Sequence, residues 1–109
     1  MDVALVPVGG EGETRFFIRA DGRHAGGITV HSACGDAFSY GIAIAPAMRR
    51  RGVASDALRA LFARMRAQGF ARAIVRVQAE NAASLALHAG LGFRETAREG
   101  GVVTLSRAL

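Results

Sequence analysis

Residues 42–54 read Ile-Ala-Ile-Ala-Pro-Ala-Met-Arg-Arg-Arg-Gly-Val-Ala, and this stretch decides the fold. Its first part alternates large and small apolar residues, a strand pattern that already begins at Phe38. Pro46 ends the strand, because proline lacks the amide that a sheet ladder uses. From Ala54 to Met65 apolar residues recur at helical spacing, with arginines on the other faces. The stretch is therefore predicted to lead from a strand through a turn directly into an amphipathic helix.

Working outward from this stretch, the flanking sequence predicts a mixed α/β domain. Residues 3–8, 14–20 and 23–31 are rich in strand formers, and Asp21-Gly22 is a strong hairpin signal. A further strand about 71–79 should lie parallel to the one about 37–45, because a helix connects them and such crossovers are right-handed. The remaining expectations are helices about 52–68 and 82–90, closing strands about 93–98 and 101–107, and few or no helices before the second strand. With no linker or repeat in view, residues 1–109 form a single predicted domain.

Composition narrows the class of protein. Half of the residues are hydrophobic, and the single cysteine, Cys34, has no partner for an internal disulfide. The start of the chain has an early acid and no basic stretch, and no apolar run is long enough to cross a bilayer. We therefore expect a cytoplasmic protein that does not enter the membrane.

Arginine supplies all of the positively charged side chains. All 14 basic residues are arginines, and the net charge is +5. A positive field attracts anions of many kinds, including nucleic acid and phosphorylated cofactors. Only Arg49, Arg50 and Arg51 are contiguous, which favours a compact polyanionic ligand over a long groove. A basic nucleic-acid-binding domain is thus a less favoured alternative.

The start of the predicted helix is suited to an anion. The first amides of a helix have no internal partners, and the helix dipole adds partial positive charge there. A pyrophosphate fits such an end. Gly52 removes a side chain where backbone would approach the ligand. The simpler interpretation is an ordinary helix start with solvated arginines.

Two segments resemble a known family. Residues 49–54, Arg-Arg-Arg-Gly-Val-Ala, are similar to the (Gln/Arg)-x-x-Gly-x-(Gly/Ala) motif of the GNAT superfamily of N-acetyltransferases. Residues 81–93 resemble that family's Asn-x-x-(Ala/Ser)-x-x-x-(Tyr/His)-x-x-x-Gly-Phe segment. With the elements between them, the resemblance covers roughly residues 38–98.

The resemblance implies an N-acetyltransferase that binds acetyl-CoA as co-substrate and transfers the acetyl group to an amine in a ternary complex. The cofactor would lie between the two parallel strands, which splay apart in this family. The backbone of Ile42, Ala43 and Ile44 would pair with the pantetheine arm. The pyrophosphate would be held by amides of seven consecutive residues: Arg49, Arg50, Arg51, Gly52, Val53, Ala54 and Ser55. Asn81 and Ser84 would contact the cofactor from the far side, although Asn81 is also a good helix cap and Ser84 an ordinary first-turn hydroxyl.

Catalytic residues are less well indicated. His88 stands where many relatives place a tyrosine that protonates the leaving sulfur; the alternative is a packed histidine bonded to a carbonyl or water. Glu80 is the best-placed carboxylate for a general base, unless it is a solvated acid at a strand end. Tyr40 is a weaker candidate, as are Asp36 and His31. The acceptor amine stays open: a protein N-terminus, a lysine side chain, a polyamine, an amino acid or an aminoglycoside.

No metal site is predicted, because zinc needs several protein ligands and only the pair His31 and Cys34 has a suitable spacing. Family members usually carry one or two helices between their first two strands, and those helices help to wall the acceptor site. Here only residues 9–13 lie between them. We therefore expect a homodimer that covers the exposed sheet surface. The same shortening leaves a non-catalytic acyl-CoA-binding or regulatory module as the main alternative function.

Overall fold

Seven strands form one sheet in the order β1-β2-β3-β4-β5-β7-β6 in the computed structural model, which describes residues 1–9, 14–32 and 35–109. Two features discussed above lie outside the described residues: Cys34 and most of the segment between the first two strands. The strands are β1 (Val3–Val8), β2 (Arg15–Ala20), β3 (Arg23–Ser32), β4 (Ala37–Ile44), β5 (Arg72–Gln78), β6 (Arg94–Glu99) and β7 (Val102–Ala108). The helices are α1 (Val53–Ala67), α2 (Ala82–Gly90) and the short 3-10 helix η1 (Pro46–Met48). The mixed α/β fold predicted from the sequence is confirmed, with no helix before β2 among the described residues.

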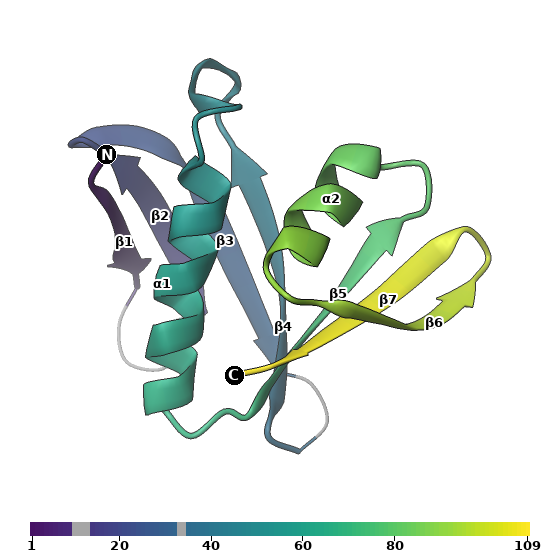
Figure 1. The fold of residues 1–109 in the computed structure, drawn as a ribbon. Coiled ribbons are helices and arrows are strands. Elements are labelled where there is room, and N and C mark those ends of the chain that lie inside the picture. Colours follow the sequence, from purple (N-terminus) through teal and green to yellow (C-terminus); the bar gives the residue numbers. More distant parts are fainter. Residues whose placement is uncertain (10–13, 33–34) are drawn as a thin grey trace.

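The parallel pair β4 and β5 separates after a short contact. Their register contains three pairs, of which Ser39 with Ile74 is the last. Beyond it β4 continues to Ile44 and β5 to Gln78, each paired only with its antiparallel neighbour. Figure 1 shows the two strands diverging from this point, so that the sheet opens into a wedge. The predicted splayed pair is thereby confirmed.

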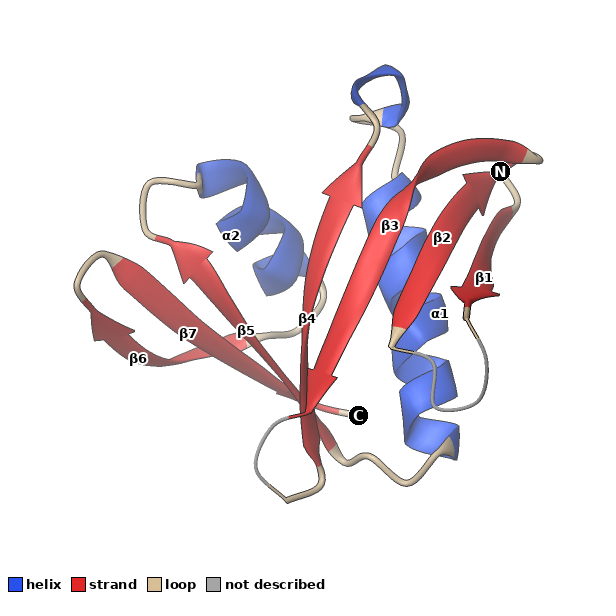
Figure 2. Cartoon of the chain, turned by 180° about the vertical axis from the view of Figure 1, so that it is seen from behind, coloured by secondary structure: helices blue, strands red, loops and turns tan. Residues whose placement is uncertain are grey.

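Both α-helices lie on the same face of the sheet, as Figures 1 and 2 show from opposite sides. The buried residues of α1 recur every three or four positions, so that they form one stripe. They are Val53, Ala57, Leu58, Leu61, Phe62 and Met65. Ala54, which the sequence pattern placed in this stripe, is half-buried instead. The helix packs on the left-hand part of the sheet in Figure 1, and α2 covers the part beyond the wedge.

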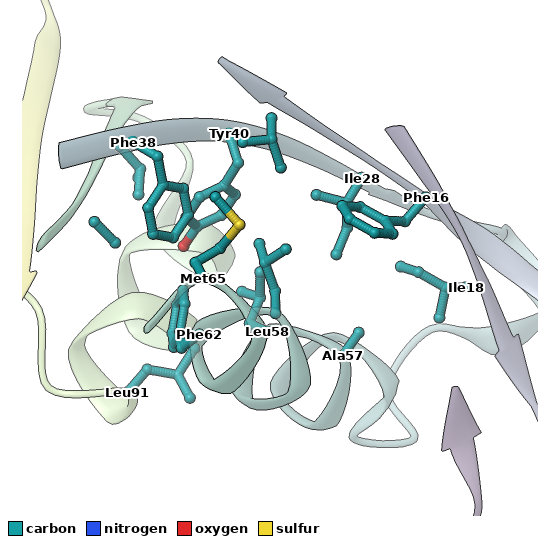
Figure 3. Packing of buried hydrophobic residues seen from close by; sticks show 14 of the residues in the cluster. Phe16, Ile18, Ile28, Phe38, Tyr40, Ala57, Leu58, Phe62, Met65 and Leu91 are labelled. Atoms are coloured by element: carbon teal, nitrogen blue, oxygen red, sulfur yellow. The ribbon is translucent and has the colours of Figure 1, made fainter. Parts of the chain in front are cut away.

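An aromatic cluster fills the space between the two helices and the sheet. Phe38 and Tyr40 of β4 face Phe62 of α1, with ring centroids 6.5 and 6.0 Å from that of Phe62. Phe93, which follows α2, lies 5.8 Å from Phe62. Figure 3 shows the β4 rings above α1, close to Met65 and Leu58. Burying a large side chain of this kind stabilises the folded state by about 1.5–3 kcal/mol. The cluster therefore joins the elements on both sides of the wedge in one hydrophobic core.

Tight turns connect the antiparallel strands. Asp21 and Gly22 have φ values of 51° and 79°, and Gly100 and Gly101 have 57° and 78°. Two successive positive φ angles are those of the type I′ turn, which fits the twist of a two-residue hairpin. The hairpin predicted at Asp21-Gly22 is therefore present, and a second hairpin joins the two closing strands. The closing strands begin one residue later than predicted, at Arg94 and Val102.

The link from β4 to α1 is longer than predicted. Instead of passing directly into α1, the chain makes the 3-10 turn η1, in which Pro46 occupies the first turn. Proline suits that place, because its fixed φ is helical and its missing amide would have no partner there. The outcome is a separate loop, residues 45–52, between the wedge and the start of α1.

The face of the sheet opposite the helices is open over the described residues. Phe16 points to the core with 3 % exposure, whereas its neighbour Phe17 is 45 % exposed on the open face. A shallow hollow of about 410 Å³ lies beside Phe17 over Gly27 and Gly41. No helix of the described residues is long and apolar enough to cross a membrane.

Candidate functional site

The wedge provides two free strand edges. From Tyr40 to Ile44, β4 is paired with β3 on one side, whereas its other edge faces the opening. Ile42 and Ile44 are half-buried and Ala43 is exposed. An unpaired edge presents backbone donors and acceptors to any extended molecule that enters. The structure thus brings the three predicted pantetheine-contacting residues to one accessible edge.

The loop after β4 is tied back onto that strand. The guanidinium Nε of Arg49 donates a hydrogen bond to the carbonyl of Ile44 over 3.2 Å, and the amide of Met48 donates to Ala45 over 2.8 Å. Arg50 has a positive φ of 63°, uncommon for a residue with a side chain. Arg49, Arg50 and Arg51 are all exposed. The loop therefore carries three arginines that lie outside the core.

Helix α1 begins without a side-chain cap. Gly52 is the N-cap residue, with φ 78°, and the amide of Asp56 is the first to bond into the helix, to the carbonyl of Gly52 at 3.1 Å. The amides of Val53, Ala54 and Ser55 therefore have no acceptor within the helix. The side chain of Val53 is buried, so only its amide is available to a ligand. Free amides, the helix dipole and the arginines all favour an anion at this end.

Helix α2 begins with a capping side chain. The Oδ1 atom of Asn81 accepts a hydrogen bond from the amide of Ser84 over 3.1 Å. This confirms the predicted cap; contact of either residue with a cofactor stays a prediction. Asn81 is exposed and Ser84 half-buried, and both lie in the first turn of the helix that follows the β5 side of the wedge.

Tyr40 and His88 meet in the protein interior. The Nε2 atom of His88 lies 3.0 Å from the hydroxyl of Tyr40, and Nδ1 lies 2.7 Å from the carbonyl of Ser84. His88 is 2 % exposed and Tyr40 7 %. The Ser84 hydroxyl lies 3.3 Å from the same Nδ1 atom. Two of the predicted catalytic residues are thus brought into direct contact, although 48 positions separate them in sequence.

Burial changes the acidity of both groups. It raises the pKa of the Tyr40 hydroxyl well above its usual value, and the positive charge of Arg107 opposes this only in part. Burial also lowers the pKa of His88, against the effect of its hydrogen bond to the Ser84 carbonyl. Near neutral pH the tyrosine is therefore protonated and the histidine uncharged.

Glu80 is not part of this cluster. It is exposed in the turn between β5 and α2, and no hydrogen bond or ion pair joins its carboxylate to another described side chain. The weaker candidates lie elsewhere. Asp36 precedes β4 at the closed end of the parallel pair, where its carbonyl accepts from the amide of Ala71. His31 is exposed on β3. His31 and Asp36 are thus not brought to the open end of the wedge.

Arg107 is a site residue that the sequence reasoning missed. Its guanidinium lies 5.0 Å from the ring centroid of Phe62, within the range of a cation–π contact. Val103 and Leu105 are buried positions of β7, and Arg107 is the next position in the same period-two series, although the intervening Ser106 is buried as well. A single charge on the buried side of an alternating strand was the available signal.

Among the described residues there is no group of three or more histidine, cysteine, aspartate or glutamate side chains that could hold a metal ion. The candidate site consists of the open wedge, the uncapped start of α1 and the buried pair of Tyr40 and His88.

Solved structures share this fold. A ribosomal-protein-alanine N-acetyltransferase from Escherichia coli superposes with a TM-score of 0.76 at 24% identity, over 92% of this chain and 71% of that one. An acetyltransferase from Bacillus subtilis in complex with CoA gives 0.79 at 16% identity, over 89% and 76%. The PaiA N-acetyltransferase from Thermoplasma acidophilum, in complex with coenzyme A, gives 0.78 at 14% identity, over 87% and 60%.

These likenesses are to the fold, since identity is low in each case. No curated protein matches the chain significantly in sequence. The model of the Acetyltransferase (GNAT) family, however, matches residues 7–93, which is well over half of the chain. The match includes the loop before α1, the wedge and all of α2. The chain belongs to the acetyltransferase (GNAT) family.

Proposed function

We propose that this protein is an N-acetyltransferase that transfers the acetyl group of acetyl-CoA to an amine by direct attack in a ternary complex. The observation that carries the proposal is the open wedge between β4 and β5 beside the uncapped start of α1. An extended thioester can pair with a strand edge while its pyrophosphate occupies a helix N-terminus. Family membership supports acyl transfer as the reaction class.

In the proposed complex the pantetheine arm lies along Ile42, Ala43 and Ile44. The pyrophosphate accepts hydrogen bonds from amides of the seven residues from Arg49 to Ser55, and the three arginines add charge. Asn81 and Ser84 contact the cofactor from the α2 side. Solved relatives from B. subtilis and T. acidophilum hold coenzyme A, which supports the choice of ligand class.

The chemical step needs a neutral amine, a stabilised oxyanion and a proton for the departing thiolate. A backbone amide of β4 near the opening is the proposed oxyanion donor. An alkyl amine has a pKa of about 10.4 in water, so its proton must be removed before attack. The catalytic candidates are Tyr40, His88 and Glu80, of which the first two are in contact with each other.

The first amine to test is the N-terminus of a peptide that begins with alanine, since a structural relative from E. coli is a ribosomal-protein-alanine N-acetyltransferase. Peptides with a lysine side chain, free amino acids, spermidine and an aminoglycoside complete the panel. Release of free thiol from acetyl-CoA reports transfer to any of them. The net charge of +5 mildly disfavours strongly cationic acceptors.

Isothermal titration with acetyl-CoA, free CoA and desulfo-CoA tests the cofactor site directly. We expect micromolar binding that Gly52→Glu weakens by at least about 100-fold, because the new carboxylate would face the pyrophosphate. Ala67→Glu is the matched control: it adds the same charge to an exposed position at the far end of α1. Unchanged affinity in Gly52→Glu would remove the pyrophosphate assignment.

A non-catalytic acyl-CoA-binding module is the second candidate. The open face of the sheet favours it, since no helix of the described residues walls an acceptor site there. Such a module binds acetyl-CoA without releasing thiol in the presence of any amine of the panel. A nucleic-acid-binding domain would instead bind DNA or RNA with strong salt dependence and would not bind acetyl-CoA.

A second copy of the chain is the proposed cover for the open face. Exposed apolar surface centred on Phe17 and the hollow beside it is the kind of surface that self-association buries. A homodimer formed in this way would also wall the acceptor side of the wedge, where Gly41 and Ala43 of β4 line the same hollow.

A further inference from the structure

The hydrogen bonds around His88 have a fixed direction. A carbonyl oxygen can only accept, so the 2.7 Å contact with Ser84 requires a proton on Nδ1 of His88. In an uncharged imidazole the other nitrogen, Nε2, then carries a lone pair. The hydroxyl of Tyr40, 3.0 Å away, therefore donates to Nε2. The order is Tyr40 hydroxyl to His88, and His88 to the Ser84 carbonyl.

This chain of bonds lies at the closed end of the wedge. Ser39 is the last β4 residue paired with β5, so Tyr40 is the first residue of the open edge. Its side chain faces the helices, where it meets His88 of α2. The contact thereby joins the β4 side of the wedge to the helix that follows β5. A thioester that enters to the end of the wedge would reach the level of Tyr40 along β4.

The direction of the bonds suits proton uptake. An amine whose N–H lies against the Tyr40 oxygen can give up its proton to that oxygen. At the same time the hydroxyl proton of Tyr40 moves to the lone pair on Nε2 of His88. The Ser84 carbonyl holds the imidazole in place and stabilises the positive charge that forms. The proton stored on Nε2 can then return by the same path.

We propose, on the basis of the acetyltransferase function above, that Tyr40 is the catalytic residue through which the proton leaves the amine and reaches the sulfur. His88 is its positioning residue and keeps the proton between the two steps. One hydroxyl then serves both halves of the reaction of an amine that is already neutral, and these two steps need no separate carboxylate base.

The first half forms the carbon–nitrogen bond. The lone pair of the amine attacks the thioester carbonyl carbon, and the carbonyl π pair moves to oxygen. The amine proton passes to the Tyr40 oxygen as the Tyr40 proton passes to Nε2 of His88. In the second half the oxyanion pair re-forms the carbonyl and the carbon–sulfur bond breaks, its electrons going to sulfur. The proton of Nε2 returns to Tyr40, and Tyr40 protonates the thiolate. The products are an amide and free CoA, with both residues restored.

The surroundings favour an uncharged resting pair. His88 contacts Tyr40 from β4 and the ring of Phe93, with centroids 5.1 Å apart in the latter case. Helix α1 contributes Phe62 to the same cluster, and α2 itself contributes Ser84. The charged group that acts on the pair is Arg107 of β7, through Tyr40. No carboxylate among the described side chains bonds to either residue.

The central test is Tyr40→Phe, which removes one oxygen atom and little packing volume. We expect kcat for the first amine that the wild type acetylates to fall about 10²–10⁴-fold, the usual contribution of acid–base catalysis. The dissociation constant for acetyl-CoA, measured by titration, should change less than about threefold, since the hydroxyl is not a cofactor-binding group. A kcat within about threefold of wild type would overturn the proposal while leaving the acetyltransferase function intact. A wild type that acetylates no amine of the panel would overturn both.

His88→Gln tests the positioning role. Glutamine can accept the Tyr40 hydrogen bond but cannot take up its proton, so kcat should fall by a similar factor and Tyr40→Phe should add little to it. His24→Gln is the control, because His24 is exposed on β3 beside Phe17, on the face of the sheet opposite Tyr40 and His88. Independent effects of Tyr40→Phe and His88→Gln that multiply in the double variant would contradict a shared proton path.

The pH profile separates this role from a structural one. The unprotonated Nε2 is needed for turnover, so kcat should fall as the pH drops through the lowered pKa of His88. Nitrogen NMR of His88 in the resting protein should show the proton on Nδ1 and none on Nε2. A proton found on Nε2 near neutral pH would overturn the proposal without any activity measurement.

Discussion

Gly52 has a left-handed backbone conformation. Its φ of 78° places it where L-residues with a Cβ atom are strained, although a Cβ there would meet no atom within 4 Å. Gly52→Ala should therefore lower the free energy of unfolding by about 1 kcal/mol, because only backbone strain is added. Urea denaturation measures this change.

Gly41 is the matched control for that substitution. It is also exposed and a Cβ there would also meet nothing within 4 Å, but it lies in β4 without a positive φ. Gly41→Ala should leave the free energy of unfolding unchanged or raise it by up to about 1 kcal/mol, since the unfolded chain loses freedom. Equal destabilisation by both substitutions would show that the conformation of Gly52 carries no strain.

His88 should make stability depend on pH. Its folded pKa lies below the unfolded value of about 6.5, so between these two values the unfolded chain binds a proton that the folded chain does not. The free energy of unfolding should therefore fall as the pH falls below 6.5, by at most about 1.4 kcal/mol per pH unit. Urea denaturation between neutral and mildly acidic pH should show this slope in His24→Gln but not in His88→Gln. An identical slope in both variants would contradict the burial effect.

At this scale the sequence predicts residues whose role is local. Asn81 is recognisable as a cap because its partner Ser84 is three positions away. The partner of His88 could not be found in that way, since Tyr40 comes from a strand 48 positions earlier and the contact exists only after the sheet and α2 have packed. Arg107 acts on Tyr40 from yet another strand. Resemblance to a family gave the position of His88 but no information on what it contacts.

At the scale of elements, the backbones of the paired strands β3 and β4 approach each other very closely at one glycine. Gly26 pairs with Ile44, and a Cβ on Gly26 would overlap the carbonyl oxygen of Ala43. Because that obstacle is backbone, it cannot rotate away. Gly26→Ala should cost at least about 2 kcal/mol of unfolding free energy, a range typical of strain at special backbone positions.

The neighbouring Gly27 provides the comparison. A Cβ there would approach only the carbonyl oxygen of Phe16, at 3.4 Å, which is ordinary contact. Gly27→Ala should therefore change the unfolding free energy by less than about 0.5 kcal/mol in the same urea experiment. Similar losses for both glycines would mean that the approach of β4 to Gly26 is not the cause.

Element existence and order follow from the sequence because each element has its own periodicity or turn signal. Period-two strands, the helical stripe and the glycine turns are local properties. The 3-10 turn η1 was missed, since Pro46 fits the end of a strand and the start of such a turn equally well. The opening of β4 from β5 was expected only from the family, because strand composition does not reveal where pairing stops.

At the scale of the whole molecule, the fold is one-sided. Both helices cover one face of the sheet, and the other face presents Phe17 between arginines of β2 with a glycine-floored hollow beside it. A single chain of 109 residues buries a modest share of its surface. Association of two copies through the open face would bury more apolar surface without lengthening the chain. It would also cover the side of the wedge where the acceptor amine is expected.

Light scattering at micromolar concentration measures this association. We expect the wild type to have twice the 11.4 kDa mass of one chain, and Phe17→Glu to have the mass of one chain, because a buried carboxylate without a partner opposes the interface. Since Phe17 is 45 % exposed in the single chain, the variant should still fold. Ala67→Glu, on the opposite side, adds the same charge and should keep the doubled mass. A wild type with the mass of one chain would refute the homodimer. A Phe17→Glu variant with the doubled mass would instead place the interface elsewhere, and the acceptor side of the wedge would then be open to solvent.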